Sequence, residues 1–230
     1  MKALVKYEKG EGHVKLMDVP VPEIGDDEVL IEVKATGVCG SDLHIYHGTY
    51  DATVPLILGH EYAGSIVKIG APASEWRVGD RVVMENNPHA CGMCAACRRG
   101  SYNICPHKRA IGFRSDGCFA DYIKAPVNLL HRIPDGLSYN VAALSEPMAV
   151  AVHAAYERGA LEKGDNVAVF GPGAIGMMCA LVARQMGASR VVLVGVNRDI
   201  ARMEIAESLG IQTVNCETDV AWLGAVDGAD

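Results

Sequence analysis

The stretch Cys91-Gly-Met-Cys94-Ala-Ala-Cys97, with Cys105 further along, decides how the first part of this chain folds. Four thiols at these spacings can close a tetrahedron around one ion, because the segment before Cys105 is long enough to loop out and return. Zn²⁺ prefers thiolates at about 2.3 Å in closed structural sites. Disulfides and unrelated core cysteines are the alternatives, but nothing else in the chain indicates secretion. The spacing therefore predicts a structural zinc site, which by itself implies no reaction.

The composition indicates an ordinary soluble globular protein. The 230 residues are 50% hydrophobic and 21% charged, with a net charge of −7, and they suffice for one large domain or two smaller ones. Nucleic acids and anionic membranes attract basic surfaces, so the charge disfavours both as partners. The amino terminus has no apolar core of a signal peptide, and cysteine-rich spacing of this kind suits a reducing cytoplasm. We expect a cytoplasmic protein.

Residues 1–150 have the pattern of a β-rich domain. From Val29 to Ala35 every second side chain is apolar, which is the period of a strand with one buried face. The runs 61–69 and 81–84 are further strand candidates. Short strands of this kind predict a compact, barrel-like sheet with functional loops between them. The segment 148–156 is Ala-rich and is expected to be a connecting helix.

Residues 151–230 have a different pattern, in which predicted apolar strands alternate with predicted helices. Charges are absent from residue 166 to residue 183, but three glycines interrupt this window, so it is a poor membrane span. Two helices are expected to end at Gly187 and Gly210, as helices commonly do. This order is the βαβαβ half of a Rossmann fold. Its predicted strands are 167–170, 191–194 and 211–214.

The loop Gly171-Pro-Gly173-Ala174-Ile175-Gly176 follows the first of these strands and opens a helix, the context that a G-x-G-x-x-G motif requires. Gly171 allows the tight turn, Gly173 lets a pyrophosphate approach the backbone, and Gly176 lets the helix pack on the strand. The helix amino terminus adds N–H groups and a positive dipole end. We expect this loop to bind NAD or NADP; a glycine-rich turn that binds nothing is the alternative.

The second predicted strand ends in Gly195-Val-Asn197-Arg198-Asp199, where a carboxylate that binds the ribose hydroxyls is expected. The missing carboxylate beside Arg198 favours NADP, or a dual preference. Alternatively, Arg198 is a solvated charge and Asp199 caps the next helix. The residues leave both interpretations open.

Cys39, His60 and Glu61 form a second and more dispersed set of metal-ligand types. A thiolate, an imidazole and a carboxylate suit zinc, and three protein ligands leave a position open for substrate. Each residue alone is more often structural than a ligand, so chemistry alone leaves this site as one possibility.

Several motifs, in order along nearly the whole chain, resemble the zinc-dependent medium-chain dehydrogenases. Ser145-Glu146-Pro147 is similar to the branch of polyol (sorbitol) and threonine dehydrogenases, because alcohol dehydrogenases have a cysteine ligand where Glu146 stands. The resemblance implies a β-rich GroES-like catalytic domain over 1–150 and a partial Rossmann domain over 151–230. The motifs are the four-cysteine lobe, the glycine loop, Gly37-Val-Cys39-Gly-Ser41-Asp-Leu-His44, Leu58-Gly-His60-Glu61-Tyr-Ala-Gly64, Val78-Gly-Asp80-Arg-Val and Asp116-Gly-Cys118-Phe-Ala-Asp-Tyr122.

The resemblance implies two zinc ions per chain, of which the catalytic one is held by Cys39, His60 and Glu61. Glu146 would be a fourth ligand or would hold the zinc-bound water. Zinc would polarise a substrate hydroxyl, hydride would pass to the nicotinamide, and Ser41 and His44 would relay the proton. A surface histidine at a helix end is the alternative for His44.

Four further residues lie in or near these motifs. Tyr46, His47 and Phe113 are candidates for the substrate pocket, with packing an equal alternative. Cys118 replaces the second glycine of the family's Asp-Gly-Gly-Phe stretch, and we expect it to crowd that turn.

The function implied is hydride transfer between NAD(P) and a secondary alcohol or polyol of the sorbitol and L-iditol type. L-Threonine or a vicinal diol such as butanediol is the alternative substrate, and a zinc-binding scaffold without catalysis is the alternative class. Family members are commonly dimers or tetramers, so a homo-oligomer is expected. A complete dinucleotide fold needs about six strands, so this sequence is predicted to be a fragment of a longer enzyme; its own activity is left open.

Overall fold

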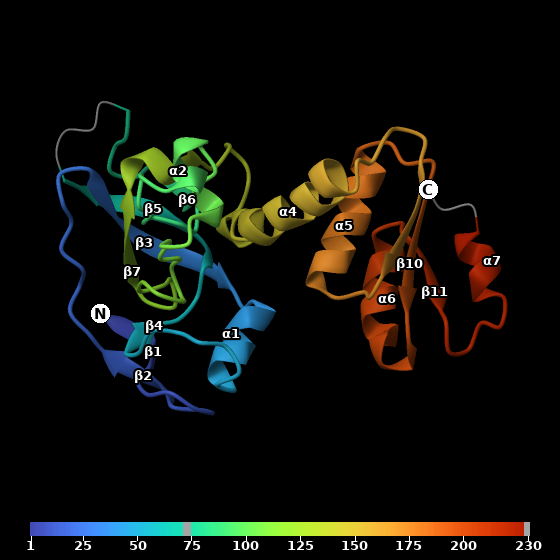
Figure 1. Ribbon diagram of the computed structural model, residues 1–230, viewed down its shortest axis with the longest axis horizontal. Helices are drawn as coiled ribbons and strands as arrows, with labels where there is room; N and C mark the ends of the chain where they lie inside the picture. The colour runs from blue at the N-terminus through green and yellow to red at the C-terminus, as the bar shows by residue number, and fades with distance from the viewer. Residues whose placement is uncertain (71–74, 228–230) are drawn as a thin grey trace. The chain divides into compact units, whose positions relative to one another are not determined.

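The computed structural model describes residues 1–70 and 75–227 (Figure 1). Its contacts divide the chain into two compact units, Met1–Glu146 and Pro147–Asp230. The predicted boundary after residue 150 falls inside helix α4 (Ser145–Val152). The last three residues of the predicted nucleotide-binding segment, 228–230, lie outside the described residues. Within the described ranges, no helix combines the length and apolar character needed to cross a bilayer.

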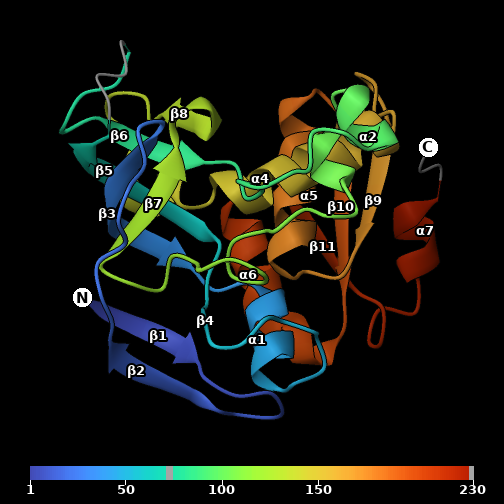
Figure 2. The same cartoon turned by 60° about the vertical axis from the view of Figure 1, so that its left-hand side comes forward.

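The first unit is built around a five-stranded antiparallel sheet, which Figure 2 shows with β3 and β5 at its centre. The predicted strands at 29–35, 61–69 and 81–84 are confirmed. The register of the central pair places Gly37, the last residue of β3, opposite Glu61, the first residue of β5. In sheet order the strands are β7 (Tyr122–Pro126), β3 (Glu28–Gly37), β5 (Glu61–Ile69), β6 (Arg81–Met84) and β8 (Leu130–Arg132).

The core of this sheet explains why the period-2 pattern folds as it does. Val29, Ile31, Ile66 and Val82 lose all their accessible surface. Burial of each such side chain contributes about 1.5–3 kcal/mol relative to leaving it in water. This apolar face fixes the register of β3 against β5, since a slip by one residue would turn it to solvent.

A smaller antiparallel sheet and several short helices complete the first unit. The sheet contains β2 (Val14–Asp18), β1 (Lys2–Lys6) and β4 (Leu56–Ile57) in that order. The helical elements are α1 (Gly40–Tyr46), α2 (Ala95–Arg98), η1 (Tyr102–Ile104), η2 (Val127–Leu129) and α3 (Tyr139–Ala142). The predicted connecting helix is α4, which continues as the π-helical segment η3 (His153–Arg158).

The second unit has the predicted βαβαβ order and a three-stranded parallel sheet, β11-β10-β9. Gly187 and Gly210 follow its two main helices with φ of 91° and 77°, values that glycine adopts without strain. The predicted architecture, a β-rich domain followed by the βαβαβ part of a parallel α/β fold, is therefore confirmed. The elements are β9 (Asn166–Phe170), α5 (Ala174–Gln185), β10 (Arg190–Gly195), η4 (Asn197–Asp199), α6 (Ile200–Ser208), β11 (Gln212–Asn215) and α7 (Trp222–Val226).

Candidate functional site

The sulfur atoms of the four-cysteine lobe, Cys91, Cys94, Cys97 and Cys105, all lie within 4.8 Å of one another. The distances from Cys105 are 3.6 Å to Cys91 and 3.9 Å to Cys94, and Cys91 lies 4.0 Å from Cys97. A regular tetrahedron with ligands about 2.3 Å from its centre has edges of about 3.8 Å. All four thiols are free rather than joined at the roughly 2.05 Å of a disulfide. The geometry therefore fits one zinc ion.

Backbone N–H groups of the lobe point at its sulfur atoms, which favours thiolates. The N–H of Cys94 donates to Cys91 Sγ at 3.4 Å, and the N–H of Cys97 donates to Cys94 Sγ at 3.5 Å. Hydrogen bonds from the backbone of Met93 and Cys94 lower the pKa of the Cys91 thiol to about 6. Thiolates this close repel each other unless a cation lies between them, so the donor set also fits zinc.

The pairing of β3 with β5 builds a second cluster. Cys39 is the N-cap of α1, two residues after the end of β3, while His60 and Glu61 stand at the start of β5. One ligand atom from each of these three residues lies within 4.8 Å of the others. Both His60 and Glu61 are buried. The structure thus brings the three predicted ligands of the catalytic zinc together in one place.

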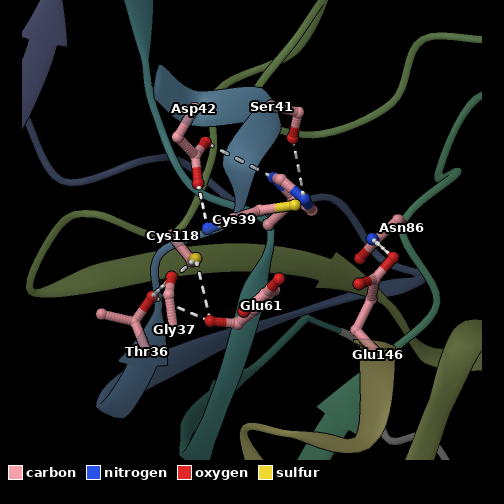
Figure 3. Close-up of polar contacts among 10 residues, drawn as sticks. Thr36, Gly37, Cys39, Ser41, Asp42, Glu61, Asn86, Cys118 and Glu146 are labelled. Carbon is pink, nitrogen blue, oxygen red and sulfur yellow. Dashed lines mark hydrogen bonds and ion pairs between the residues drawn. The ribbon is translucent and has the colours of Figure 1, made fainter. Parts of the chain in front are cut away.

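A close approach between Gly37 and Glu61 requires glycine at residue 37 (Figure 3). A Cβ atom added there would lie only 2.1 Å from Glu61 Oε2. Any larger side chain would therefore push the carboxylate away from the cluster. Gly40, one residue after Cys39, is the opposite case. Among the described residues, no atom lies within 4 Å of the Cβ atom that would be added there.

Asp42 supports this cluster, and the sequence interpretation missed it. Its side chain is buried, and Oδ2 accepts a 2.9 Å hydrogen bond from the backbone N–H of Cys39 (Figure 3). Its other oxygen lies 3.5 Å from His60 Nδ1. The carboxylate thereby ties one ligand to the other and leaves His60 Nε2 free for an ion. The available signal was the spacing, because an acidic residue at the third helical position completes a capping box with Cys39.

The electrostatics of His60 reflect these neighbours. Burial alone would lower the pKa of the imidazole, but contact with the Asp42 carboxylate and the Cys39 sulfur raises it to about 9. A metal ligand must be a neutral imidazole, so a bound cation would take the place of this proton. The same negative environment that holds a proton would attract a metal ion.

Glu146 lies beside the cluster but outside the group that shares the 4.8 Å limit. Its Oε1 accepts a 2.7 Å hydrogen bond from Asn86 Nδ2, as Figure 3 shows. Burial raises the pKa of Glu146; Glu61 and Asp42 raise it further, while His60 opposes them. Asn86 is a second residue that the sequence interpretation missed, and no local pattern identifies it.

The two predicted proton-relay residues occupy different settings. Ser41 Oγ lies 3.5 Å from His60 Nε2, against the cluster. His44 is exposed on α1, and its Nδ1 lies 3.3 Å from Thr49 Oγ1. No hydrogen bond joins Ser41 to His44 among the residues described. The relay through both residues stays a prediction.

Among the pocket candidates, only Phe113 contacts the cluster, with its ring centroid 4.9 Å from that of His60. Tyr46 and His47 are exposed on α1. The thiol of Cys118 packs in the core without exposed surface and lies 3.3 Å from Thr36 Oγ1, and the expectation that it crowds its turn stays a prediction. The crowded position is the preceding Gly117, where a Cβ atom would lie 2.1 Å from the Gly59 carbonyl oxygen.

The glycine loop of the second unit has the features that phosphate binding needs. Gly171 has a φ of 96°, and a Cβ atom at Gly176 would lie 2.0 Å from the Gly171 carbonyl oxygen. Gly173, the N-cap of α5, has nothing within 4 Å of its Cβ position and leaves the helix amino terminus without a side-chain cap. Ala174 and Ile175 are exposed in the first turn of the helix. The loop therefore fits a pyrophosphate.

The end of β10 carries Arg198 and Asp199, the two residues on which the predicted nucleotide preference depends. Asp199 is buried, accepts a 3.3 Å hydrogen bond from the backbone N–H of Val196, and pairs with Arg202 at 3.2 Å. Asp199 thus has a structural role. Arg198 is exposed and makes no ion pair within the described chain.

A carboxylate that the sequence interpretation overlooked lies at the same strand end. Glu217 Oε2 accepts a 2.7 Å hydrogen bond from the backbone N–H of Asn197.

Comparisons with known proteins agree with this fold and site. Residues 25–135 match the model of the alcohol dehydrogenase GroES-like domain. The chain is 41% identical over 215 residues to a D-arabitol-phosphate dehydrogenase of Enterococcus avium, covering 93% of this chain and 61% of the relative. It is 43% identical over 211 residues to a sorbitol dehydrogenase of Halalkalibacterium halodurans, covering 92% of this chain and 61% of the relative. It is 38% identical to the L-threonine 3-dehydrogenase of Escherichia coli K12, with 100% and 69% covered.

Solved structures give the same result. A structure described as that of a zinc-binding dehydrogenase from Sinorhizobium meliloti, bound to NADP, matches 96% of this chain and 64% of its own, at 33% identity and a TM-score of 0.89. Galactitol-1-phosphate dehydrogenase from Escherichia coli matches 98% of this chain and 66% of its own, at 30% identity and a TM-score of 0.86. The chain thus spans about 61% of the length of the first curated relatives that it matches.

Proposed function

Because the chain belongs to the zinc-containing medium-chain alcohol dehydrogenase family, we propose that it carries the metal centres of an oxidoreductase that transfers hydride between a secondary alcohol or polyol and NAD(P). The observation that carries this proposal is the convergence of Cys39, His60 and Glu61 within 4.8 Å. Three protein ligands are the number that catalytic zinc sites use, whereas structural zinc sites take four.

The residues of the first unit have separate roles in this proposal. Zinc at Cys39, His60 and Glu61 would supply Lewis-acid polarisation of the substrate hydroxyl, and NAD(P) would supply the hydride acceptor. Asp42, 3.5 Å from His60 Nδ1, would orient the imidazole so that Nε2 is the nitrogen that holds the ion.

Glu146, with its raised pKa, can hold the water or substrate hydroxyl at the fourth position, while Asn86 fixes its carboxylate. Ser41, whose Oγ lies 3.5 Å from His60 Nε2, would accept the hydroxyl proton, and His44 would carry it to solvent.

The substrate and the nucleotide need finer assignment. The relatives are named for arabitol phosphate, sorbitol and threonine, so a sorbitol-like polyol, L-threonine and a vicinal diol are all candidates. Exposed Arg198, without an ion-pair partner in the described chain, favours NADP or dual use. Cytoplasmic location and assembly as a dimer or tetramer stay predictions.

Metal content tests the proposal against the rival of a non-catalytic scaffold. We expect two zinc ions per chain by elemental analysis, and one after Cys39→Ser. Cys179→Ser, which alters a cysteine outside both clusters, is the control and should keep two ions. One zinc ion in the unaltered chain would support the scaffold. Reduction of NAD and NADP with sorbitol, threonine and butanediol then compares the substrates.

A further inference from the structure

A pocket of about 700 Å³ lies in the first unit, between the loop after α1 and the segment that follows the last ligand of the four-cysteine lobe. This volume is within the range of about 300–1,000 Å³ that small-molecule sites occupy. Among the described residues, none that lines it carries a carboxylate, although the thiol of Cys105, a predicted zinc ligand, belongs to the lining. The lining residues that matter for binding are Tyr50, His107, Lys108, Arg109, Phe113 and Arg114.

The charge of this pocket contrasts with that of the chain as a whole. The net charge of the protein is −7, yet between Cys97 and Ser115 there is no Asp or Glu. Lys108, Arg109 and Arg114 bring three of this segment's cations to one pocket. A concentration of positive charge in an acidic protein indicates an anionic ligand.

These cations are held mostly by backbone oxygens, which leaves their charge available. Arg109 donates from Nε and Nη2 to the Arg114 carbonyl oxygen at 3.1 and 3.0 Å. Lys108 Nζ donates to the Asn103 carbonyl oxygen at 2.6 Å. In the described part of the chain neither has a carboxylate partner, and Arg114 has only a long 3.7 Å contact with exposed Asp51. The pocket therefore keeps most of its positive charge.

One aromatic side chain connects the pocket to the candidate catalytic zinc site. Phe113 lines the pocket, and its ring centroid lies 4.9 Å from that of the ligand His60. Tyr50 meets the same ring edge-on at 5.3 Å. A ligand whose anionic end lies among the cations would therefore contact the same aromatic ring that contacts His60.

We propose that this pocket binds the phosphate group of the substrate, so that the substrate is the phosphate monoester of a polyol rather than a neutral polyol. The inference rests on the proposed function for the polyol end. A phosphate monoester carries about −1.5 to −2 charge at neutral pH and accepts charge-assisted hydrogen bonds from ammonium and guanidinium groups. Threonine fits less well, because it is a zwitterion of zero net charge, whereas a phosphate monoester brings a net negative charge to three cations.

Calorimetric titration of the zinc-loaded chain with four probes tests this inference without relying on hydride transfer. The probes are D-arabitol phosphate, D-arabitol, inorganic phosphate and L-threonine. We expect D-arabitol phosphate to bind at least tenfold more tightly than each of the others. Lys108→Gln and Arg114→Gln should each remove most of this preference and leave the weak binding of arabitol unchanged.

Arg99→Gln is the matched control, because it removes the same charge from the same segment at an exposed position outside the pocket. It should keep the preference. Equal binding of the phosphorylated and free polyol, or a preference that survives both pocket substitutions, would overturn the inference. Tight binding of threonine, or of inorganic phosphate as strongly as of the ester, would also overturn it. Zinc content and binding of free arabitol test the proposed function separately. Failure of the proposed function can therefore be distinguished from failure of the inference about phosphate.

Discussion

The four-cysteine lobe and the Cys39–His60–Glu61 cluster hold similar donors but are built in different ways. The lobe takes all its ligands from residues 91–105, and short loops and turns bring their sulfur atoms within 4.8 Å of one another. The second cluster joins residues from both sides of a strand pair and depends on the register of β3 against β5. The comparison teaches that the four-cysteine lobe is made by local contacts, whereas the second cluster depends on two strands being paired in one register.

The largest expected effect is loss of the lobe's zinc. Structural zinc contributes about 10–16 kcal/mol of apparent binding free energy in small zinc-binding peptides. Cys97→Ser should therefore remove one zinc ion per chain and destabilise the protein by about 3 kcal/mol or more, which lowers Tm by about 6–12 °C. Elemental analysis and thermal unfolding measure both quantities.

Cys39→Ser provides the comparison, because it also removes one thiolate ligand but from the sheet-built cluster. It should likewise cost one zinc ion, with less than half the fall in Tm. If both substitutions lower Tm equally, the proposed difference between a structural and a catalytic site is wrong.

The next effect tests the register directly. Gly37→Ala places a Cβ atom 2.1 Å from Glu61 Oε2, and forced overpacking of this kind costs about 1–3 kcal/mol. We expect zinc affinity at the second cluster to fall about tenfold or more, while the lobe keeps its ion. Competition with a fluorescent chelator measures the two affinities.

Gly40→Ala is the control for this prediction, because its Cβ position has no neighbour within 4 Å. It should leave both zinc affinities nearly unchanged. An equal loss in the two variants would mean that general disturbance of α1, rather than displacement of Glu61, is responsible.

Asp42→Asn should weaken zinc binding at the second cluster by about tenfold, the lower end of what is typical when the partner of a metal-ligating histidine is removed. In the zinc-free chain it should also change the pH dependence of stability. The folded pKa of His60 is raised to about 9, above the usual value of about 6.5. Protonated His60 therefore stabilises the fold fully below about pH 6.5, and this stabilisation is lost as pH rises through about 9.

Thermal unfolding of the zinc-free chain between pH 6 and pH 10 measures this loss. The decline in Tm over that range should be clearly smaller in Asp42→Asn. The same decline in both proteins would show that the carboxylate does not hold the imidazolium.

Ser41→Ala should have the smallest effect on metal binding. Its hydroxyl lies 3.5 Å from His60 Nε2, too far for a strong hydrogen bond, so we expect less than a twofold change in zinc affinity at either site. A large loss of zinc would make Ser41 part of the metal site rather than a proton acceptor.

Several elements were predictable because their signals are local. The strands at 61–69 and 81–84 follow from alternation, and the stops at Gly187 and Gly210 follow from glycine's access to positive φ. Asp42 and Asn86 were missed because their roles depend on what lies opposite them in space. Glu217 was missed for the same reason, since it meets Asn197 only through the pairing of β10 with β11.

The sequence by itself determined the spacing of the four cysteines, the glycine pattern of the nucleotide loop and the order of strands and helices. These depend on contacts between near neighbours, and side-chain type and periodicity report such contacts directly. Only the tertiary structure decided that Cys39 meets His60 and Glu61, that Asp42 joins two of them, and that three cations surround one pocket beside Phe113. The physical reason is that burial of the apolar face shared by β3 and β5 selects one register, and that register alone places distant side chains within bonding distance.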